Sequence, residues 1–179
     1  LSLPGSVRLI MDPGMAFGSG SHETTHLCLE YLDENPPKNI SVLDYGCGSG
    51  VLGIASLLLG ADEVIAIDID PQALIATEEN SRLNNVSSKI QIGMPDDFVK
   101  VKADILFANI LANTLKDLKE HFLNLTNPNA RIVMSGIMEN QLQKIKNHYE
   151  RDIDIIEVRK KNGWCLVAGI KKTNLRQQH

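Results

Sequence analysis

The sequence predicts a single α/β domain: a mainly parallel sheet with an antiparallel last strand and helices on both faces. From residue 41 onward, short β-branched runs alternate with helical patterns, which is typical of parallel strands joined by crossover helices. The last two strand-like runs are separated only by Lys161, Asn162 and Gly163, and Asn-Gly is a hairpin signal. A chain of 179 residues also fits one domain better than two.

Seven strands and five helices are expected along the chain. The strands are residues 41–45, 63–68, 89–93, 103–109, 130–135, 152–160 and 164–170. The helices are residues 22–32, 51–59, 71–83, 111–123 and 139–149. Pro71 suits the first turn of its helix, and Asp70 is the expected N-cap.

Composition and charge argue against several classes of protein. The longest apolar run, residues 51–59, is shorter than the ~18 residues needed to cross a bilayer. A net charge of −4 and an aromatic content of 4% disfavour a dedicated nucleic-acid binder. The three cysteines are scattered without a CxxC pair, so neither a disulfide framework nor a zinc site is expected. We therefore expect a cytoplasmic protein with no metal, no membrane contact and no direct nucleic-acid partner.

A glycine-rich turn follows the first strand. Gly46, Gly48 and Gly50 alternate after Asp44, and glycines allow both a sharp turn and close approach of a ligand to the main chain. Asp68 ends the second strand at the same edge of the sheet, where a carboxylate can accept hydrogen bonds from both hydroxyls of a ribose. This order indicates a nucleoside-binding site; glycines that serve packing alone are the less favoured alternative.

Two nucleoside cofactors are compatible with this turn. Residues 48–53 satisfy the GxGxxG fingerprint, which is typical of an NAD-dependent oxidoreductase. However, the glycines already begin at Gly46, directly after an acid-containing strand, and no separate substrate domain is expected. That arrangement resembles the first motif of S-adenosylmethionine-dependent methyltransferases, whose sheet also ends with an antiparallel strand. The expected hairpin at Asn162 and Gly163 therefore favours a methyltransferase.

Further segments resemble one methyltransferase family over nearly the whole chain, from about Leu9 to Lys171. Residues 11–25 resemble its "DPG-AFGTG-H-TT" segment, and residues 68–73 its second acidic motif. Residues 108–112 resemble its "ANILA" segment, and Trp164-Cys165 also match. The family is the bacterial methyltransferases of large-subunit ribosomal protein L eleven. The resemblance implies a Rossmann-like class I methyltransferase fold and S-adenosyl-L-methionine as cofactor. The implied substrate is that ribosomal protein, methylated on lysine side chains, with the α-amine as a further candidate.

The expected cofactor-binding residues come partly from the turn and partly from the resemblance. Gly46 and Gly48 are expected beside the methionine part and Asp68 at the ribose. The resemblance adds Thr25, Asn109 and Phe17, the last in a lid segment with Gly18 and Gly20. Open alternatives are a helix N-terminal role for Thr25 and a plain core role for Phe17.

Asn109 and Ile110 are the expected catalytic pair. The Asn109 side-chain carbonyl and the Ile110 backbone carbonyl can accept hydrogen bonds from an amine and aim its lone pair. Capping of the next helix is the alternative role for Asn109. His22, at a helix start, is expected to be structural rather than a general base. Asp97 is expected either at the adenine or as a solvated loop acid.

The chain divides, on this interpretation, into an N-terminal segment (1–40) with a cofactor-covering loop and helix, a methyltransferase core (41–172) in the same domain, and a frayed tail (173–179). The family's N-terminal substrate-recognition domain has no counterpart in the sequence, so a fragment is expected. A cofactor-binding module without turnover is the remaining alternative. The modified amines, the degree of methylation and the oligomeric state lie beyond what the sequence predicts.

Overall fold

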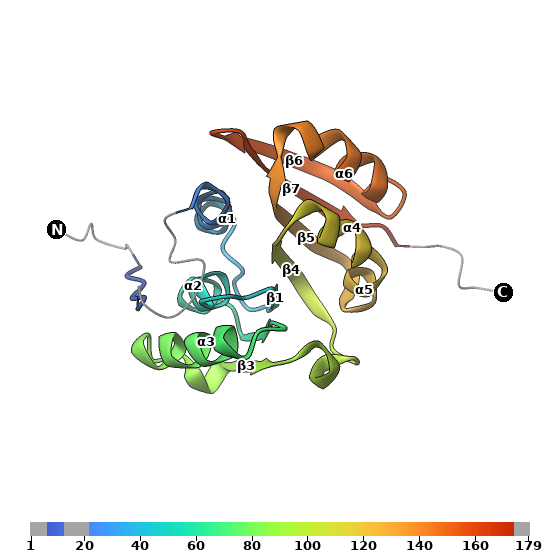
Figure 1. Ribbon diagram of the computed structural model, residues 1–179. Coiled ribbons are helices and arrows are strands. Elements are labelled where there is room, and N and C mark those ends of the chain that lie inside the picture. Colours follow the sequence, from blue (N-terminus) through green and yellow to red (C-terminus); the bar gives the residue numbers. More distant parts are fainter. Residues whose placement is uncertain (1–6, 13–21, 174–179) are drawn as a thin grey trace.

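The computed structural model describes residues 7–12 and 22–173 of the chain. The expected lid around Phe17 and almost all of the expected tail lie outside these residues. Within them, seven strands form one sheet in the order β3-β2-β1-β4-β5-β7-β6 (Figure 1). The strands are β1 (Ser41–Tyr45), β2 (Glu63–Ile67), β3 (Ile90–Gly93), β4 (Ala103–Asn109), β5 (Thr126–Met138), β6 (Ile153–Lys161) and β7 (Trp164–Lys171).

Strand directions confirm the predicted fold. The strands β1 to β5 are parallel, and β7 runs antiparallel to both of its neighbours, β5 and β6. Asn162 and Gly163 both have positive φ, of 49° and 83°, in the two-residue turn that joins β6 to β7. Asn and Gly tolerate this left-handed backbone, which matches the twist of the paired strands.

Helices cover both faces of the sheet (Figure 1). One face carries α1 (Glu23–Glu34), α2 (Val51–Leu58) and α3 (Pro71–Leu83), and the other carries α4 (Ala112–Asp117), α5 (Lys119–Asn124) and α6 (Leu142–Tyr149). The described residues also form three short 3-10 helices: Ser87–Lys89, Pro95–Phe98 and Glu139–Gln141. Successive residues of the central strand β4 enter opposite cores, Leu106 with the α4–α6 layer and Phe107 with the α1–α2 layer. This alternation explains why the middle of the strand, residues 105–108, is apolar.

The strand β5 is longer at both ends than the predicted 130–135. At its start the register shifts before Arg131, and Asn129 has a positive φ of 62°. Near its end the register shifts again around Gly136, whose φ is 82°, and pairing resumes with Ile137 opposite Cys165. Residues that suit turns therefore lie at bulges inside one strand, which hides its continuation from the sequence pattern.

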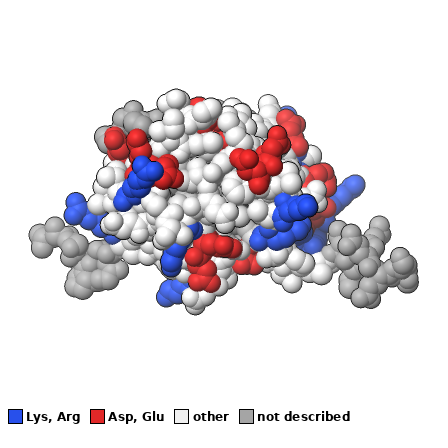
Figure 2. Space-filling view, turned by 90° about the horizontal axis from the view of Figure 1, so that it is seen from below, with Lys and Arg blue, Asp and Glu red and all other residues white. Residues whose placement is uncertain are grey.

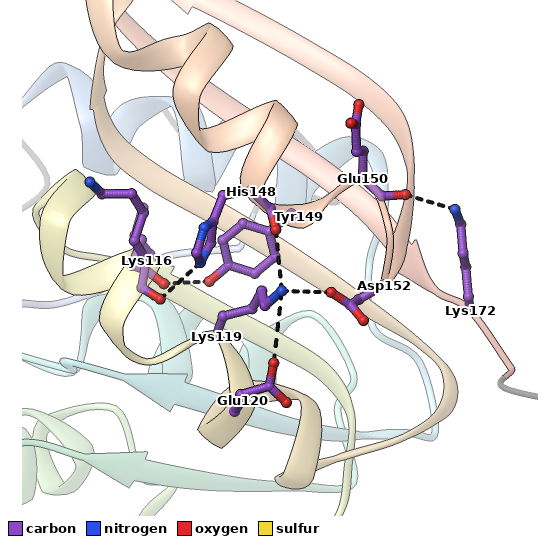
Figure 3. Close-up of polar contacts among 9 residues, drawn as sticks. Lys116, Lys119, Glu120, His148, Tyr149, Glu150, Asp152 and Lys172 are labelled. Atoms are coloured by element: carbon purple, nitrogen blue, oxygen red, sulfur yellow. Dashed lines mark hydrogen bonds and ion pairs between the residues drawn. The ribbon is translucent and has the colours of Figure 1, made fainter. Parts of the chain in front are cut away.

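The predicted helix over residues 111–123 is two helices, with the break at Leu118. Side chains from α6 bind the carbonyls that end α4: the Tyr149 hydroxyl donates to Leu115 O (2.5 Å) and His148 Nε2 donates to Lys116 O (3.1 Å). In return, Lys119 Nζ donates to His148 O (3.3 Å) and Asp152 Oδ2 (2.8 Å), as Figure 3 shows. These contacts from a distant segment end α4 where no glycine or proline does.

Charged side chains of both signs are interspersed on the face seen in Figure 2. In the part of the chain that the structure describes, no helix is long and apolar enough to cross a membrane. Nor do these residues include a group of three or more His, Cys, Asp or Glu side chains placed to hold a metal ion.

Candidate active site

A cavity of about 680 Å³ opens at the carboxyl edge of the parallel strands. The sheet order changes direction between β1 and β4, and the cavity is lined by residues that follow both strands. Ligands of open α/β sheets bind at this kind of switch point. The volume lies within the range of small-molecule sites, roughly 300–1,000 Å³.

The glycine turn after β1 forms the floor of the cavity. Gly46, Gly48 and Gly50 have φ values of 75°, 55° and 78°, a backbone region that favours glycine. A Cβ atom at Gly46 would also clash with the Ile110 side chain. The turn is anchored to β2, because the main-chain N–H groups of Gly46 and Cys47 both donate to Ile67 O (2.8 and 3.0 Å).

Asp68 lies beside this turn, as the sequence predicts. Its Oδ2 accepts a hydrogen bond from Gly48 N (2.9 Å), and its Oδ1 accepts one from Asp70 N (3.0 Å). An ionised carboxylate has about four lone-pair sites, so two such bonds leave capacity for ribose hydroxyls. Asp70 itself accepts from Gln72 N (2.9 Å), which confirms its predicted role as the N-cap of α3.

Polar side chains of α3 bind the main chain of the glycine turn. These contacts were not predicted from the sequence. Thr77 Oγ1 donates to Gly48 O (3.0 Å), and Asn80 Nδ2 donates to Ser49 O (2.9 Å). Asn80 Oδ1 also accepts from Asp12 N (2.9 Å), so the same side chain holds the N-terminal segment. Their spacing was the only sign of this in the sequence: Thr77 and Asn80 are three residues apart, so they lie on the same side of the helix, and both are buried.

Asp44, one residue before the end of β1, is a second residue missing from the predicted site. Its carboxylate is 2% exposed, lines the cavity and accepts from Gly53 N (2.9 Å). Gly53 is in the first turn of α2, whose N-cap Gly50 has no side chain to offer, so Asp44 caps that helix from the strand. Burial raises the pKa of Asp44 to about 7, although the Gly53 N–H lowers it; the charge of Asp68 raises it further.

The opposite wall carries the predicted acceptor residues. Asn109 Nδ2 donates a hydrogen bond to Thr25 Oγ1 (3.2 Å). This bond orients the amide group and uses its N–H side, so the side-chain carbonyl oxygen can still accept a hydrogen bond. The alternative that Asn109 caps the next helix is wrong, because the N-cap of α4 is Leu111 and no side chain forms a capping hydrogen bond there. Ile110 packs between two glycines, since a Cβ at Gly46 would meet its side chain and one at Gly136 would meet its carbonyl oxygen.

The remaining predicted residues take the following places. Thr25 is 2% exposed and pairs with Asn109 rather than with its own helix terminus. His22 is the N-cap of α1, with Nδ1 accepting from Thr24 N (3.3 Å), which supports the predicted structural role. Asp97 accepts from Met94 N (2.8 Å) and so caps the short helix Pro95–Phe98. Phe17 lies outside the described residues.

The fold and this cavity define a Rossmann-like α/β domain of the class I methyltransferase type. Comparison with known proteins then identifies the family. The sequence model of the ribosomal protein L11 methyltransferase (PrmA) family matches residues 3–172, so the chain belongs to that family.

Individual relatives agree with this assignment. The chain is 44% identical over 170 residues to the ribosomal protein L11 methyltransferase of Saccharophagus degradans and 45% identical over 169 residues to that of Nitrosococcus oceani. Each match covers 94% of this chain but only 58% of the relative's length. The crystal structure of ribosomal protein L11 methylase from Lactobacillus delbrueckii subsp. bulgaricus superposes with a TM-score of 0.84 at 34% identity, covering 92% of this chain and 86% of the other.

Proposed function

We propose that this chain binds S-adenosylmethionine and transfers its methyl group to amines of large-subunit ribosomal protein L11. Lysine side chains are the main acceptors, with the α-amine as a further one. The observation that carries the proposal is the shared cavity, in which Asp68 and the glycine turn face the Asn109–Ile110 segment. The names of the relatives support the choice of substrate. Membership of a methyltransferase family removes the ground for the NAD-dependent oxidoreductase alternative.

The residues fit the proposed cofactor. Asp68 keeps lone pairs for the ribose, and the turn exposes backbone to the methionine part. Asp44 places a carboxylate at the same cavity, where a cationic ligand favours its charged form. Thr25 contributes to the site by accepting a hydrogen bond from Asn109 and so holding its side chain. When bound, the cofactor supplies a methyl group activated by a positive sulfonium.

Asn109 and Ile110 act on the acceptor. Their carbonyl oxygens accept hydrogen bonds from the amine and align its lone pair, and alignment of this kind lowers a barrier without a covalent intermediate. A lysine amine has an ordinary pKa near 10.4, so only the minor neutral form attacks. Neutral acceptors suit this step, because a carboxylate in their place would stabilise the unreactive ammonium.

Mass spectrometry tests the proposal directly. The chain is incubated with isotopically labelled S-adenosylmethionine and purified ribosomal protein L11, and the peptides are mapped. We expect labelled methyl groups on lysine residues with wild-type protein and at least ~10-fold fewer with Asn109→Ala. Cofactor binding without any transferred methyl group would instead support a binding module without turnover.

A further inference from the structure

A second, more open cavity of about 360 Å³ adjoins the active site. It is lined by Met138, Glu139, Asn140, Gly163 and Trp164. Trp164 also lines the main cavity and is the one residue that the two linings share. Its side chain therefore borders both cavities at the place where they meet.

The fold holds Trp164 at this place. It is the first residue of β7, and because β7 is antiparallel, its start lies at the carboxyl edge of the parallel strands. It pairs with Met138 of β5 on one side and Lys161 of β6 on the other. Its indole meets the His22 ring edge to face, with centroids 5.2 Å apart, and His22 is itself fixed as the N-cap of α1.

The order of the sheet separates the two halves of the main cavity. Asp68 and the glycine turn follow β2 and β1, Asn109 ends β4, and Trp164 begins β7 beyond β5. With strands about 4.8 Å apart, Trp164 lies two strand spacings from Asn109, on the side away from the ribose residue. A lysine side chain that reaches Asn109 from this side would lie along the indole.

We propose that the acceptor lysine enters through the second cavity and that Trp164 is a specificity-determining residue that packs against its alkyl chain and its methylated ammonium. The inference rests on the proposed function. Each added methyl removes an N–H that Asn109 and Ile110 could bind, and a quaternary ammonium has none left. Aromatic side chains, tryptophan above all, attract such cations through the ring face. Glu139 also lines the second cavity, where its exposed carboxylate pairs with Lys160 Nζ (3.5 Å).

Fluorescence tests this contact without activity, because Trp164 is the only tryptophan of the chain. The protein saturated with S-adenosylhomocysteine is titrated with the amide of Nα-acetyl-Nε-trimethyl-lysine. We expect a saturable change in Trp164 emission, and the same titration with N-acetyl-glycine amide should give none. An emission that does not respond to the trimethyl-lysine probe would overturn the proposed contact.

Kinetics test the role in specificity. Trp164→Leu should raise the KM for ribosomal protein L11 by ~10-fold, while the cofactor affinity stays within about twofold. Trp164→Phe should recover most of the loss, which a change in packing alone would not predict. Asn140→Phe, which fills the second cavity, should also raise the KM, whereas Lys144→Phe on the exposed side of α6 should not.

The outcomes separate the inference from the proposed function. Wild-type protein that transfers no methyl group would refute the proposed function, whatever Trp164 does. Active wild-type protein whose KM is unchanged by both Trp164→Leu and Asn140→Phe would refute the entry route alone. Equal losses of cofactor and substrate affinity in a folded Trp164→Leu variant would likewise refute it, since they would place the indole at the cofactor.

Discussion

At the scale of single residues, two polar side chains that line the cavity are each held by hydrogen bonds inside the protein. Asp68 accepts from two main-chain N–H groups, and Asn109 donates to Thr25. These internal bonds hold the side chains in one orientation before a ligand arrives. Pre-organisation of this kind reduces the entropy lost on binding, so each residue has a measurable effect when it is changed.

Asp68→Ala should weaken binding of S-adenosylhomocysteine by at least ~10-fold. The variant loses charge-assisted hydrogen bonds to the ribose, each of which contributes roughly 1.5–3 kcal/mol. Titration calorimetry measures the change. Asp62→Ala, an exposed acid just before β2, is the matched control and should bind like wild type. Equal affinities of Asp68→Ala and wild type would exclude the ribose role.

Asn109→Ala should lower kcat by at least ~10-fold while the cofactor affinity changes less, because alignment of the amine acts in the transition state. Stopped-time methylation assays with thermal melts of the same samples separate turnover from folding. Asn147→Ala, on the exposed face of α6, removes an amide away from the cavity and should leave kcat unchanged. A folded Asn109→Ala protein with normal turnover would show that the amide does not orient the acceptor.

Asp44 predicts a pH dependence of stability. Its pKa is raised from 3.8 to about 7 in the folded chain, so between these values the folded state binds a proton that the unfolded state lacks. The associated stability is fully present below pH 3.8 and is lost as the pH rises through about 7. Asp44→Asn cannot titrate, so wild type should lose melting temperature relative to the variant between about pH 4 and pH 7. If the melting temperatures of the two proteins changed with pH in the same way, the raised pKa of Asp44 would be contradicted.

At the scale of elements, the sequence pattern predicted those strands and turns that depend on neighbouring residues in the chain. The strands β1 and β4 were predicted to the residue, because central parallel strands contain a continuous apolar stretch, here residues 42–43 and 105–108, between polar or glycine residues. The glycine turn, Asp68 and Asn109 were placed correctly at one edge for the same reason. The predicted ends of β5 were wrong because bulges extend the strand beyond them. The predicted single helix over residues 111–123 was wrong because side chains from α6 bind the last carbonyls of α4. The contacts of Asn80 with the turn are equally long-range and carry no local motif.

The break between α4 and α5 yields a prediction for these two helices. Tyr149→Phe removes the hydroxyl that binds Leu115 O and should destabilise the protein by about 1–3 kcal/mol in urea unfolding. Tyr31→Phe is the matched control: this tyrosine is also buried, and its side chain contacts Phe107 and the Arg159 guanidinium through the ring, which phenylalanine keeps, so little stability should be lost. If the two variants are equally stable, the bond across the helices does not stabilise the break.

At the scale of the whole molecule, the cavity lies where the two core layers meet. Cys47, Val51 and Leu52 belong to the layer under α1 and α2, while Tyr45 and Ile110 belong to the layer under α4 to α6, and all five line the cavity. A ligand in it therefore contacts both layers across the edge of one sheet. Binding should stabilise the domain as a unit rather than one half of it.

Ligand-dependent melting tests this coupling and the choice of cofactor together. S-adenosylhomocysteine at about 100 times its Kd should stabilise the folded chain by about 2.7 kcal/mol, through mass action on the folded state alone. For a domain of this size that corresponds to a rise in melting temperature of about 5–10 °C, in a single transition. NAD⁺ at the same concentration should produce no rise, and Asp68→Ala should lose most of the effect of S-adenosylhomocysteine. A transition that splits in two on binding would contradict the coupling of the layers, and stabilisation by NAD⁺ instead would contradict the proposed cofactor.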